Sequence, residues 1–305
     1  MKRLVFGIVI CFLVMAITAF SVTVQEGREN KTEIIEKSFS MDPARPARIE
    51  FRDVDGNLYF SSSPDNTVKI KITKEVRSRS TKKAERLLRD TRVAISQNGN
   101  SVDVRIKYPR FRGIFFWLSD YQRVKVTTEI QVPQKASFKA DLVDGSINGN
   151  DFAGDLELDT VDGSIHLNRV QGSVKAHAVD GDMVFREMAG SVKAQTTDGK
   201  IQLSGDFKNL WLKSVDGDIQ AELLPSSAME SDWEIRTVDG DVDILVPADF
   251  SSDFSLRSSD GRIRSEVPLT ITGKVSEKRL EGKLRSGGRL FSIRTGDGHI
   301  SLRKK

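Results

Sequence analysis

Aspartates that recur before glycine at a fixed interval of eighteen residues are the side chains of this sequence best placed to do chemistry. Five of them follow one another without a break: Asp144, Asp162, Asp180, Asp198 and Asp216. If equal positions stack in space, these carboxylates form a ladder (the Asp ladder) that could chelate calcium between rungs. Calcium prefers roughly six to eight oxygen ligands, and the Gly-Gly-x-Gly-x-Asp motif of calcium-binding solenoids is absent. We therefore expect each Asp to accept hydrogen bonds from its own turn, with no metal and no cofactor; calcium on the ladder is the alternative.

The other residues with catalytic potential do not converge on one site. The three histidines fall at different places in the repeat: His166, His177 and His299. They predict no zinc site and no acid–base cluster. One unit contains four acids that could suggest a glycan-cleaving solenoid: Asp151, Asp155, Glu157 and Asp159. Its tight turns leave no cleft, and motifs for a serine nucleophile, a phosphate loop or a metalloprotease are absent, so we predict that the protein is not an enzyme.

The eighteen-residue period predicts a stack of repeats in which each unit buries its apolar face against its neighbours. Apolar and polar residues alternate along two segments of each unit, which are separated by a second turn at Gly154, Gly172 and Gly190. The expected fold is all-β: a single-stranded β-solenoid, or β-helix, with two-strand coils of 18 residues spaced about 4.8 Å apart. An antiparallel meander is the alternative because Asp-Gly also favours hairpins, but a meander does not need so strict a unit length.

Stacking also predicts columns of outward-facing side chains. The thirteenth residue after each Asp gives Glu157, Lys175, Lys193 and Trp211, and the fifteenth gives Asp159, His177, Gln195 and Lys213. A flat face with regularly spaced polar groups can contact an extended polymer or another protein, or it can simply face solvent. Lys175, Lys193 and Trp211 are our candidate binding residues on this face.

The chain begins with Lys2 and Arg3, followed by an uncharged run from Leu4 to Phe20 and small residues. These are the parts of a secretory signal, so we expect an exported protein. Residues 4–20 are also just long enough to act as an uncleaved membrane anchor. The only cysteine, Cys11, lies inside this run, so a cleaved chain would have no thiol for a disulfide, a metal or catalysis.

The expected organisation follows from where the repeat is regular. Residues 1–21 are the signal peptide or anchor, 22–46 a linker with a first strand lead-in, and 47–305 the solenoid domain, which is irregular over 47–133, regular over 134–221 and looser over 222–305. The turn of the repeat already occurs at residues 54–56, so the array could begin there. A short helix starting near Ser80 is expected to cover an end or flank of the stack. The last unit, Gly298 to Leu302, is expected to close the array, with the basic residues after it protecting the exposed edge.

Two features of the first half could mark a membrane or partner surface. Between Lys69 and Arg112 there are fourteen Lys and Arg against four Asp and Glu, on a chain whose net charge is +4. This segment could meet anionic lipids or acidic glycans, or it could consist of ordinary solvated faces. The densest aromatic cluster follows it, and its candidate binding residues are Phe115, Phe116 and Trp117. They could lie at a membrane interface or fold back as a plug over the end of the solenoid.

The run Val124 to Pro133, followed by strands separated by Val-Asp-Gly-Ser-Ile and Ala-Gly-Asp-Leu-Glu-Leu, resembles a bacterial exported β-strand-repeat domain of unknown function, often labelled "putative adhesin". The resemblance spans Ala47 to Leu302. It implies an exported β-solenoid and brings no catalytic residues.

Together these observations predict a non-enzymatic, adhesin-like interaction or structural module of the cell envelope, in the periplasm or on the cell surface. Its expected partner is an envelope protein, a glycan or an anionic membrane surface, and not nucleic acid. The alternative is a membrane-surface or envelope-stress accessory protein tethered by its N-terminus; a glycan-active enzyme is the least favoured reading.

Overall fold

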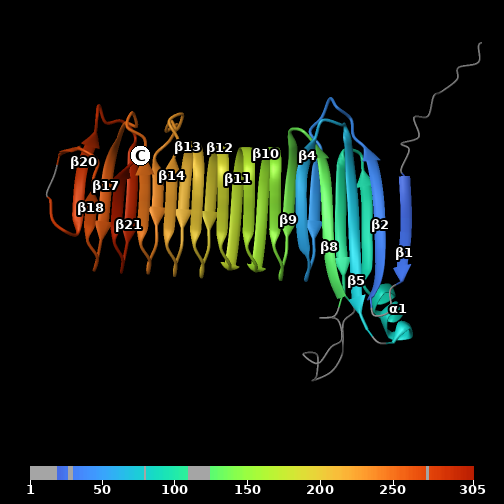
Figure 1. Ribbon diagram of the computed structural model, residues 1–305. Coiled ribbons are helices and arrows are strands. Elements are labelled where there is room, and N and C mark those ends of the chain that lie inside the picture. Colours follow the sequence, from blue (N-terminus) through green and yellow to red (C-terminus); the bar gives the residue numbers. More distant parts are fainter. Residues whose placement is uncertain (1–18, 27–29, 79, 109–123, 273–274) are drawn as a thin grey trace, which may run out of the picture.

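The computed structural model describes residues 19–26, 30–78, 80–108, 124–272 and 275–305, and these form an elongated stack of strands with a broader N-terminal end (Figure 1). In the middle of the stack, successive strands lie parallel at an offset of eighteen residues. These strands are β10 (Ile147–Asp162), β11 (Ile165–Asp180), β12 (Met183–Gln195) and β13 (Ile201–Lys213). Ile147 pairs with Ile165, Ile165 with Met183, and Met183 with Ile201. The predicted β-solenoid is confirmed, and the meander is wrong for this part of the chain.

Each of these strands bends at its middle and contributes to two facing sheets. The predicted second turn is confirmed at Gly154, Gly172 and Gly190, which all have positive φ. A second bend residue was not expected: Asp151, Arg169 and Glu187 also have positive φ, at the same place in successive coils.

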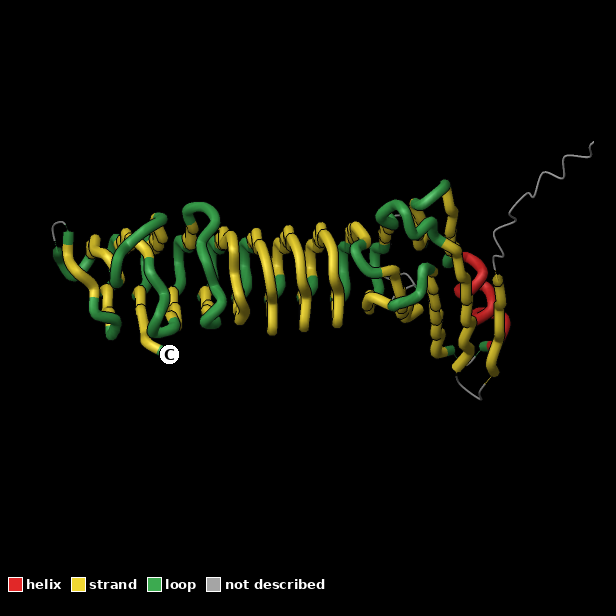
Figure 2. The backbone as a smooth tube through the Cα atoms, turned by 90° about the horizontal axis from the view of Figure 1, so that it is seen from above, coloured by secondary structure: helices red, strands yellow, loops and turns green. Residues whose placement is uncertain are grey.

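The first sheet contains the first halves of β10 to β13. It continues through β4 (Asn57–Ser63) at one end, and through β14 (Ile219–Leu223), β16 (Val242–Val246), β22 (Ile300–Lys304) and β18 (Ile263–Ser265) at the other. The second sheet contains the second halves. It continues through β9 (Ala136–Asp141), β3 (Arg48–Arg52) and β7 (Ser101–Lys107) at one end, and through β15 (Trp233–Arg236), β21 (Leu290–Thr295) and β17 (Ser252–Ser258) at the other. Figure 2 shows the resulting narrow stack from above.

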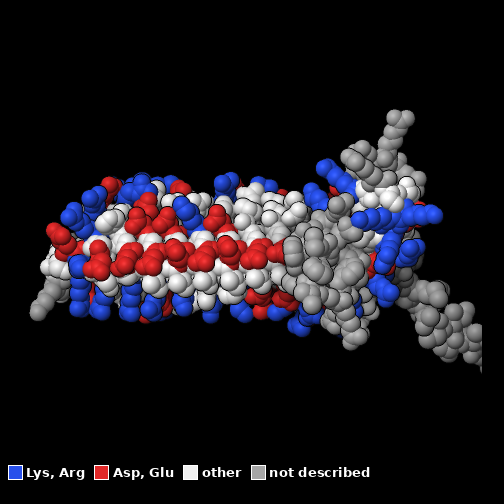
Figure 3. Space-filling model, turned by 90° about the horizontal axis from the view of Figure 1, so that it is seen from below, with Lys and Arg blue, Asp and Glu red and all other residues white. Residues whose placement is uncertain are grey.

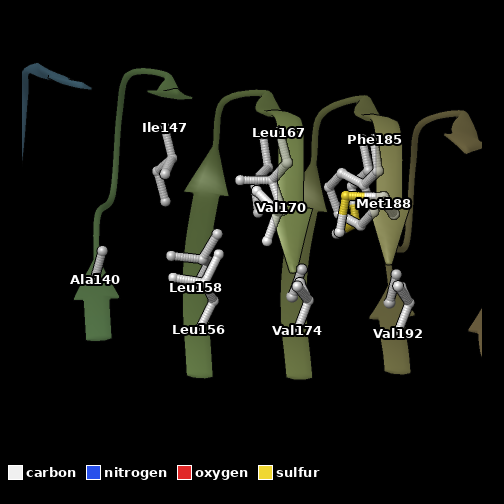
Figure 4. Close-up of a cluster of buried hydrophobic side chains, with 14 of the residues drawn as sticks. Ala140, Ile147, Leu156, Leu158, Leu167, Val170, Val174, Phe185, Met188 and Val192 are labelled. Atoms are coloured by element: carbon white, nitrogen blue, oxygen red, sulfur yellow. The ribbon is translucent and has the colours of Figure 1, made fainter. Parts of the chain in front are cut away.

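The core is the thin layer between these sheets. Figure 4 shows Leu167 and Val174, from the two halves of β11, on facing sides of this layer, with their counterparts repeated in the next coil. The Ile column behaves as predicted: Ile147, Ile165 and Ile201 are completely buried. Because each coil has little interior of its own, its apolar side chains are shielded mainly by the coils above and below.

The array begins at residues 54–56, as expected. The Asp144 N–H donates to the carbonyl oxygen of Val54 over 2.7 Å, and the Gly56 N–H donates to that of Asp144 over 3.1 Å. Beyond this first coil, further strands extend both sheets and close the end of the stack. On the first sheet, β8 (Val124–Pro133) pairs parallel with β4, and β5 (Thr67–Arg77), β2 (Asn30–Ser40) and β1 (Ala19–Glu26) follow in antiparallel order. On the second sheet, β6 (Arg92–Asn98) pairs antiparallel with β7.

The expected linker at 22–46 is therefore wrong, because most of it forms β1 and β2. Ile35 and Phe39 of β2 are buried against β5, opposite Ile72 and Val68. Charged residues dominate this segment and mask the alternation of apolar and polar residues in β2.

The predicted helix is confirmed as α1 (Thr81–Asp90), with Ser80 as its N-cap. Lys74 of β5, which is 3% exposed, holds the C-terminal end of this helix. Its ammonium donates to the carbonyl oxygens of Leu88 and Thr91 over 2.9 and 3.0 Å, and it pairs with Glu33 at 3.0 Å. A buried lysine is tolerated here because the helix carbonyls and the carboxylate replace its water shell.

The expected closure of the array by Gly298 to Leu302 is wrong. Strand β22 lies between β16 and β18: Ile300 pairs with Val242 on one side and with Ile263 on the other. After β15 and β16 the chain skips one coil position and forms the final coil from β17 and β18. It then adds β19 (Leu269–Ile271) and β20 (Arg279–Leu284), with β20 antiparallel to both β17 and β19. Strands β21 and β22 finally fill the skipped position. In Figure 1 the C-terminus accordingly lies within the stack. Ile300 and Leu302 are fully buried, with β16 on one side and β18 on the other.

The glycines at the coil corners set how closely neighbouring coils approach. A Cβ on Gly172 would lie 2.1 Å from the carbonyl oxygen of Gly154, and a Cβ on Gly190 would lie 2.2 Å from that of Gly172. Both distances are far inside van der Waals contact, so only glycine allows the coils to stack at this corner.

A second ladder lies inside the Asp-Gly turn. Two residues before most of the turn aspartates is a buried Ser or Thr whose hydroxyl donates to the glycine carbonyl of the neighbouring coil. The donors are Thr196, Ser214, Thr237, Thr295 and Ser258, at 2.8 to 3.4 Å. These bonds tie each turn to the next one.

We predict that Gly172→Ala destabilises the protein by about 3 kcal/mol or more, because the new methyl group overlaps a carbonyl of the next coil. Urea unfolding followed by circular dichroism measures the loss. Gly99→Ala is the matched control: Gly99 also has positive φ, but no atom lies within 4 Å of its added Cβ. It should cost about 1 kcal/mol, and equal losses at both sites would rule out the steric explanation.

Replacing Thr196 by Val should destabilise the protein by about 1 kcal/mol, because its hydroxyl donates to the carbonyl oxygens of Gly181 and Asp198. Thr160 occupies the same column and is also buried, but its hydroxyl has no partner among the described residues. Thr160→Val should therefore leave the urea midpoint unchanged or raise it. A similar loss in both variants would show that the hydroxyl ladder is not stabilising.

Candidate binding faces of the solenoid

The predicted Asp ladder exists and is longer than expected. Parallel bridges connect eight turn aspartates in successive coils: Asp55, Asp144, Asp162, Asp180, Asp198, Asp216, Asp239 and Asp297. The turns are joined through the main chain; for example, the Gly145 N–H donates to the carbonyl oxygen of Asp162 over 3.0 Å. Acidic side chains form a continuous band along this edge of the solenoid (Figure 3).

The carboxylates of the five predicted ladder residues behave differently from our expectation. They are exposed, and none of them accepts a hydrogen bond or forms an ion pair within the described structure. The side-chain hydrogen bonds at these turns are of other kinds: Ser and Thr hydroxyls donate to glycine carbonyls, and Asp182, two positions after a turn aspartate, accepts the Lys200 N–H of the next coil over 2.8 Å. In the described part of the chain, no group of three or more His, Cys, Asp or Glu could hold a metal ion.

The second sheet brings the predicted binding residues together in one outward column, where Glu157, Lys175, Lys193 and Trp211 pair in sequence. Glu157 accepts from both Lys139 and Lys175 over 3.1 Å, and these two ammonium groups lower its pKa. Lys193 lies 4.8 Å from the centre of the Trp211 ring, within the range of a cation–π interaction. These cations therefore already have partners within the face.

Phe115, Phe116 and Trp117, the other predicted binding residues, lie outside the described residues. Several basic residues of the segment before them have acidic partners: Lys69 pairs with Asp65 at 2.9 Å, and Lys71 pairs with Glu129 at 3.5 Å. This pairing agrees with ordinary solvated faces.

The predicted column that ends at Lys213 continues along the same sheet through three further residues, which we did not predict. Lys213 on β13 pairs with Arg236 on β15, Arg236 with Arg294 on β21, and Arg294 with Arg257 on β17. We call these four residues the cationic row. Each precedes an Asp-Gly turn by three residues, so the signal was present in the sequence. It was hidden because the later repeats are unequal in length and β21 is inserted out of chain order.

One carboxylate inside the first coil is buried. Asp53, 5% exposed, occupies the position that Ser or Thr fills in later coils, and it accepts the Val54 N–H over 2.7 Å. Burial raises its pKa to about 6, although its hydrogen bonds to the backbone and to Tyr108 act in the opposite direction. The Tyr108 hydroxyl donates to the carbonyl oxygen of Asp55.

The raised pKa predicts how stability depends on pH. Between pH 4 and 6 the folded protein binds the Asp53 proton more tightly than the unfolded chain does, so stability falls as pH rises through this window, by about 3 kcal/mol. Asp53→Asn should remove this part of the fall and be more stable than the parent protein at pH 7.5. Denaturant titrations at pH 4.5, 6 and 7.5 measure it; parallel curves for both proteins would contradict the assignment to Asp53.

Three solved structures are similar to this chain in outline, and each alignment covers 88% of it. They are a "putative adhesin" from Bacteroides fragilis NCTC 9343 (12% identity, TM-score 0.47, 96% of that chain), a "putative adhesin" from Parabacteroides merdae ATCC 43184 (14%, 0.34, 95%) and a "putative lipid binding protein" from Parabacteroides distasonis ATCC 8503 (10%, 0.34, 96%). No curated protein sequence matches.

The profile of one protein family, described as Toastrack DUF4097, matches residues 56–303, from the first Asp-Gly turn to the last strand. This match spans most of the chain and includes the corner glycines, the hydroxyl ladder and the turn aspartates that define the coil. The protein therefore belongs to the Toastrack DUF4097 family, a family of unknown function.

Proposed function

We propose that this protein is an exported, non-enzymatic module of the bacterial cell envelope that binds a partner through the outward columns of its solenoid. One observation carries the proposal: parallel, in-register stacking converts single exposed side chains into continuous rows along the axis of the molecule. Such rows suit an extended partner, because each additional coil repeats a similar contact at the same spacing. An adhesin-like or scaffolding role uses this geometry directly.

Export rests on the N-terminal sequence, in which Lys2 and Arg3 precede the apolar run Leu4 to Phe20. Within the described part of the chain, no helix is both long and apolar enough to cross a membrane. Strand β1 begins at Ala19 and pairs with β2 from that residue onward. An uncleaved apolar run would thus be joined directly to the edge strand of the N-terminal sheet.

The proposal predicts that full-length protein expressed in cells fractionates with the envelope. Mass spectrometry of its N-terminus distinguishes a cleaved signal from an anchor, and chemical cross-linking in intact cells, followed by purification, should recover an envelope protein or polymer. Val9→Asp, which interrupts the apolar run, should retain the chain in the cytoplasm. Cytoplasmic location of the parent protein, or the absence of any envelope component after cross-linking, would refute the function.

A further inference from the structure

The cationic row places like charges directly opposite one another. Arg236 and Arg294 are cross-strand neighbours in a parallel sheet, with Lys213 and Arg257 as the next members on either side. Like charges at directly opposed positions destabilise a sheet. A soluble fold gains nothing from four such positions in succession, so the row requires a different explanation from the packing columns beside it.

Elsewhere on the solenoid, several outward cations have acidic partners on a neighbouring coil. Arg169 binds Asp151 with two hydrogen bonds of 2.6 and 2.9 Å, and Lys139 and Lys175 share Glu157. In the row, only Arg257 has such a partner, Glu281 at 3.3 Å. Within the described residues, Lys213, Arg236 and Arg294 form no ion pair and no side-chain hydrogen bond, which leaves their donors available to a ligand.

We propose that the cationic row binds an extended acidic polysaccharide, lying along the solenoid axis with its carboxylates on successive coils. This inference rests on the proposed function and names the partner class. One cation per coil, at a coil spacing of about 4.8 Å, matches a thin polymer with regularly repeated charges. Arginine suits this role because its planar guanidinium can donate two parallel hydrogen bonds to one carboxylate.

The surroundings of the row favour a thin polymer over a flat anionic membrane. Three residues after each row member comes a turn aspartate: Asp216, Asp239, Asp297 and Asp260. This acidic edge runs parallel to the row and would repel a planar anionic surface that approached both together. On the other side of the row, the residues two positions before its members are all non-basic: Trp211, Glu234, Ser292 and Ser255. Among these positions, positive charge is therefore confined to the row.

Trp211 supports a sugar ligand specifically. It lies on β13 two residues before Lys213 and therefore on the same face, and its side chain is partly exposed. The amphipathic indole can cover the apolar face of a sugar ring while the neighbouring cation binds a carboxylate. The Lys193 ammonium over the same ring adds positive charge at this end of the row.

The test uses protein purified from cells that express the full-length chain, with polygalacturonate as the acidic probe and dextran as the neutral one. Isothermal titration calorimetry at low salt should show binding to polygalacturonate only, weakening as salt is added. The double variant Arg236→Gln, Arg294→Gln should bind about ten- to a hundredfold more weakly, because two charge-assisted contacts are lost. Its thermal midpoint should equal or exceed that of the parent protein, because like-charge repulsion is relieved.

Arg169→Gln is the matched control, since it removes an exposed, already paired arginine from the same solenoid; it should leave polygalacturonate binding unchanged. Equal weakening by both changes would reduce the effect to net charge and overturn the assignment to the row. Absence of binding to polygalacturonate, or tighter binding to anionic phospholipid vesicles, would also overturn it. These outcomes do not depend on cell fractionation or cross-linking. A negative binding result would therefore overturn the acidic polysaccharide as ligand without contradicting the proposed envelope function.

Discussion

At the coil corners, main chain approaches main chain so closely that only glycine fits, and this contact sets the stacking of the whole solenoid. At Gly172 and its equivalents, any side chain would overlap the carbonyl oxygen of the next coil, and the Asp-Gly turn has the same restriction at Gly163. With glycine at both corners, the coils stack in register and their backbone groups pair along two sheets. The register then decides which side chains are neighbours, both in the core between the sheets and on the outer surface.

Inside the stack, the apolar residues of successive coils align because the coils are in register, and together they form one continuous core. The Ile column and its facing Leu, Val and Ala residues are buried by neighbouring coils more than by their own, so stability accumulates along the axis. The Ser and Thr ladder adds a polar counterpart, in which buried hydroxyls donate to glycine carbonyls of the neighbouring coil. Asp53, in the first coil, takes this position at the cost of a buried carboxylate, and it marks the junction with the antiparallel cap.

Outside the stack, the same register concentrates charge in rows. The Asp ladder and the cationic row follow one another around each of the later coils, separated by three residues, and neither is neutralised by the other within the described structure. The electrostatic character of the surface is thus organised in lines along the axis, in contrast to the paired charges of Glu157, Lys139 and Lys175 further along the second sheet. In the function that we propose, an extended partner would lie along these lines of charge.

Periodicity, alternation and turn residues were enough to predict the solenoid, its two-strand coil, the second corner at Gly154, Gly172 and Gly190, the short helix and the family. These features are local: a fixed period and an alternating pattern report backbone geometry wherever the chain repeats itself. Tertiary structure alone decided which coils are neighbours. It placed β22 between β16 and β18, paired β2 with β5, and aligned Arg236 with Arg294, although 58 residues separate the two arginines. Long-range pairing of this kind depends on which strand edge remains open when each segment folds, and no local pattern encodes that choice.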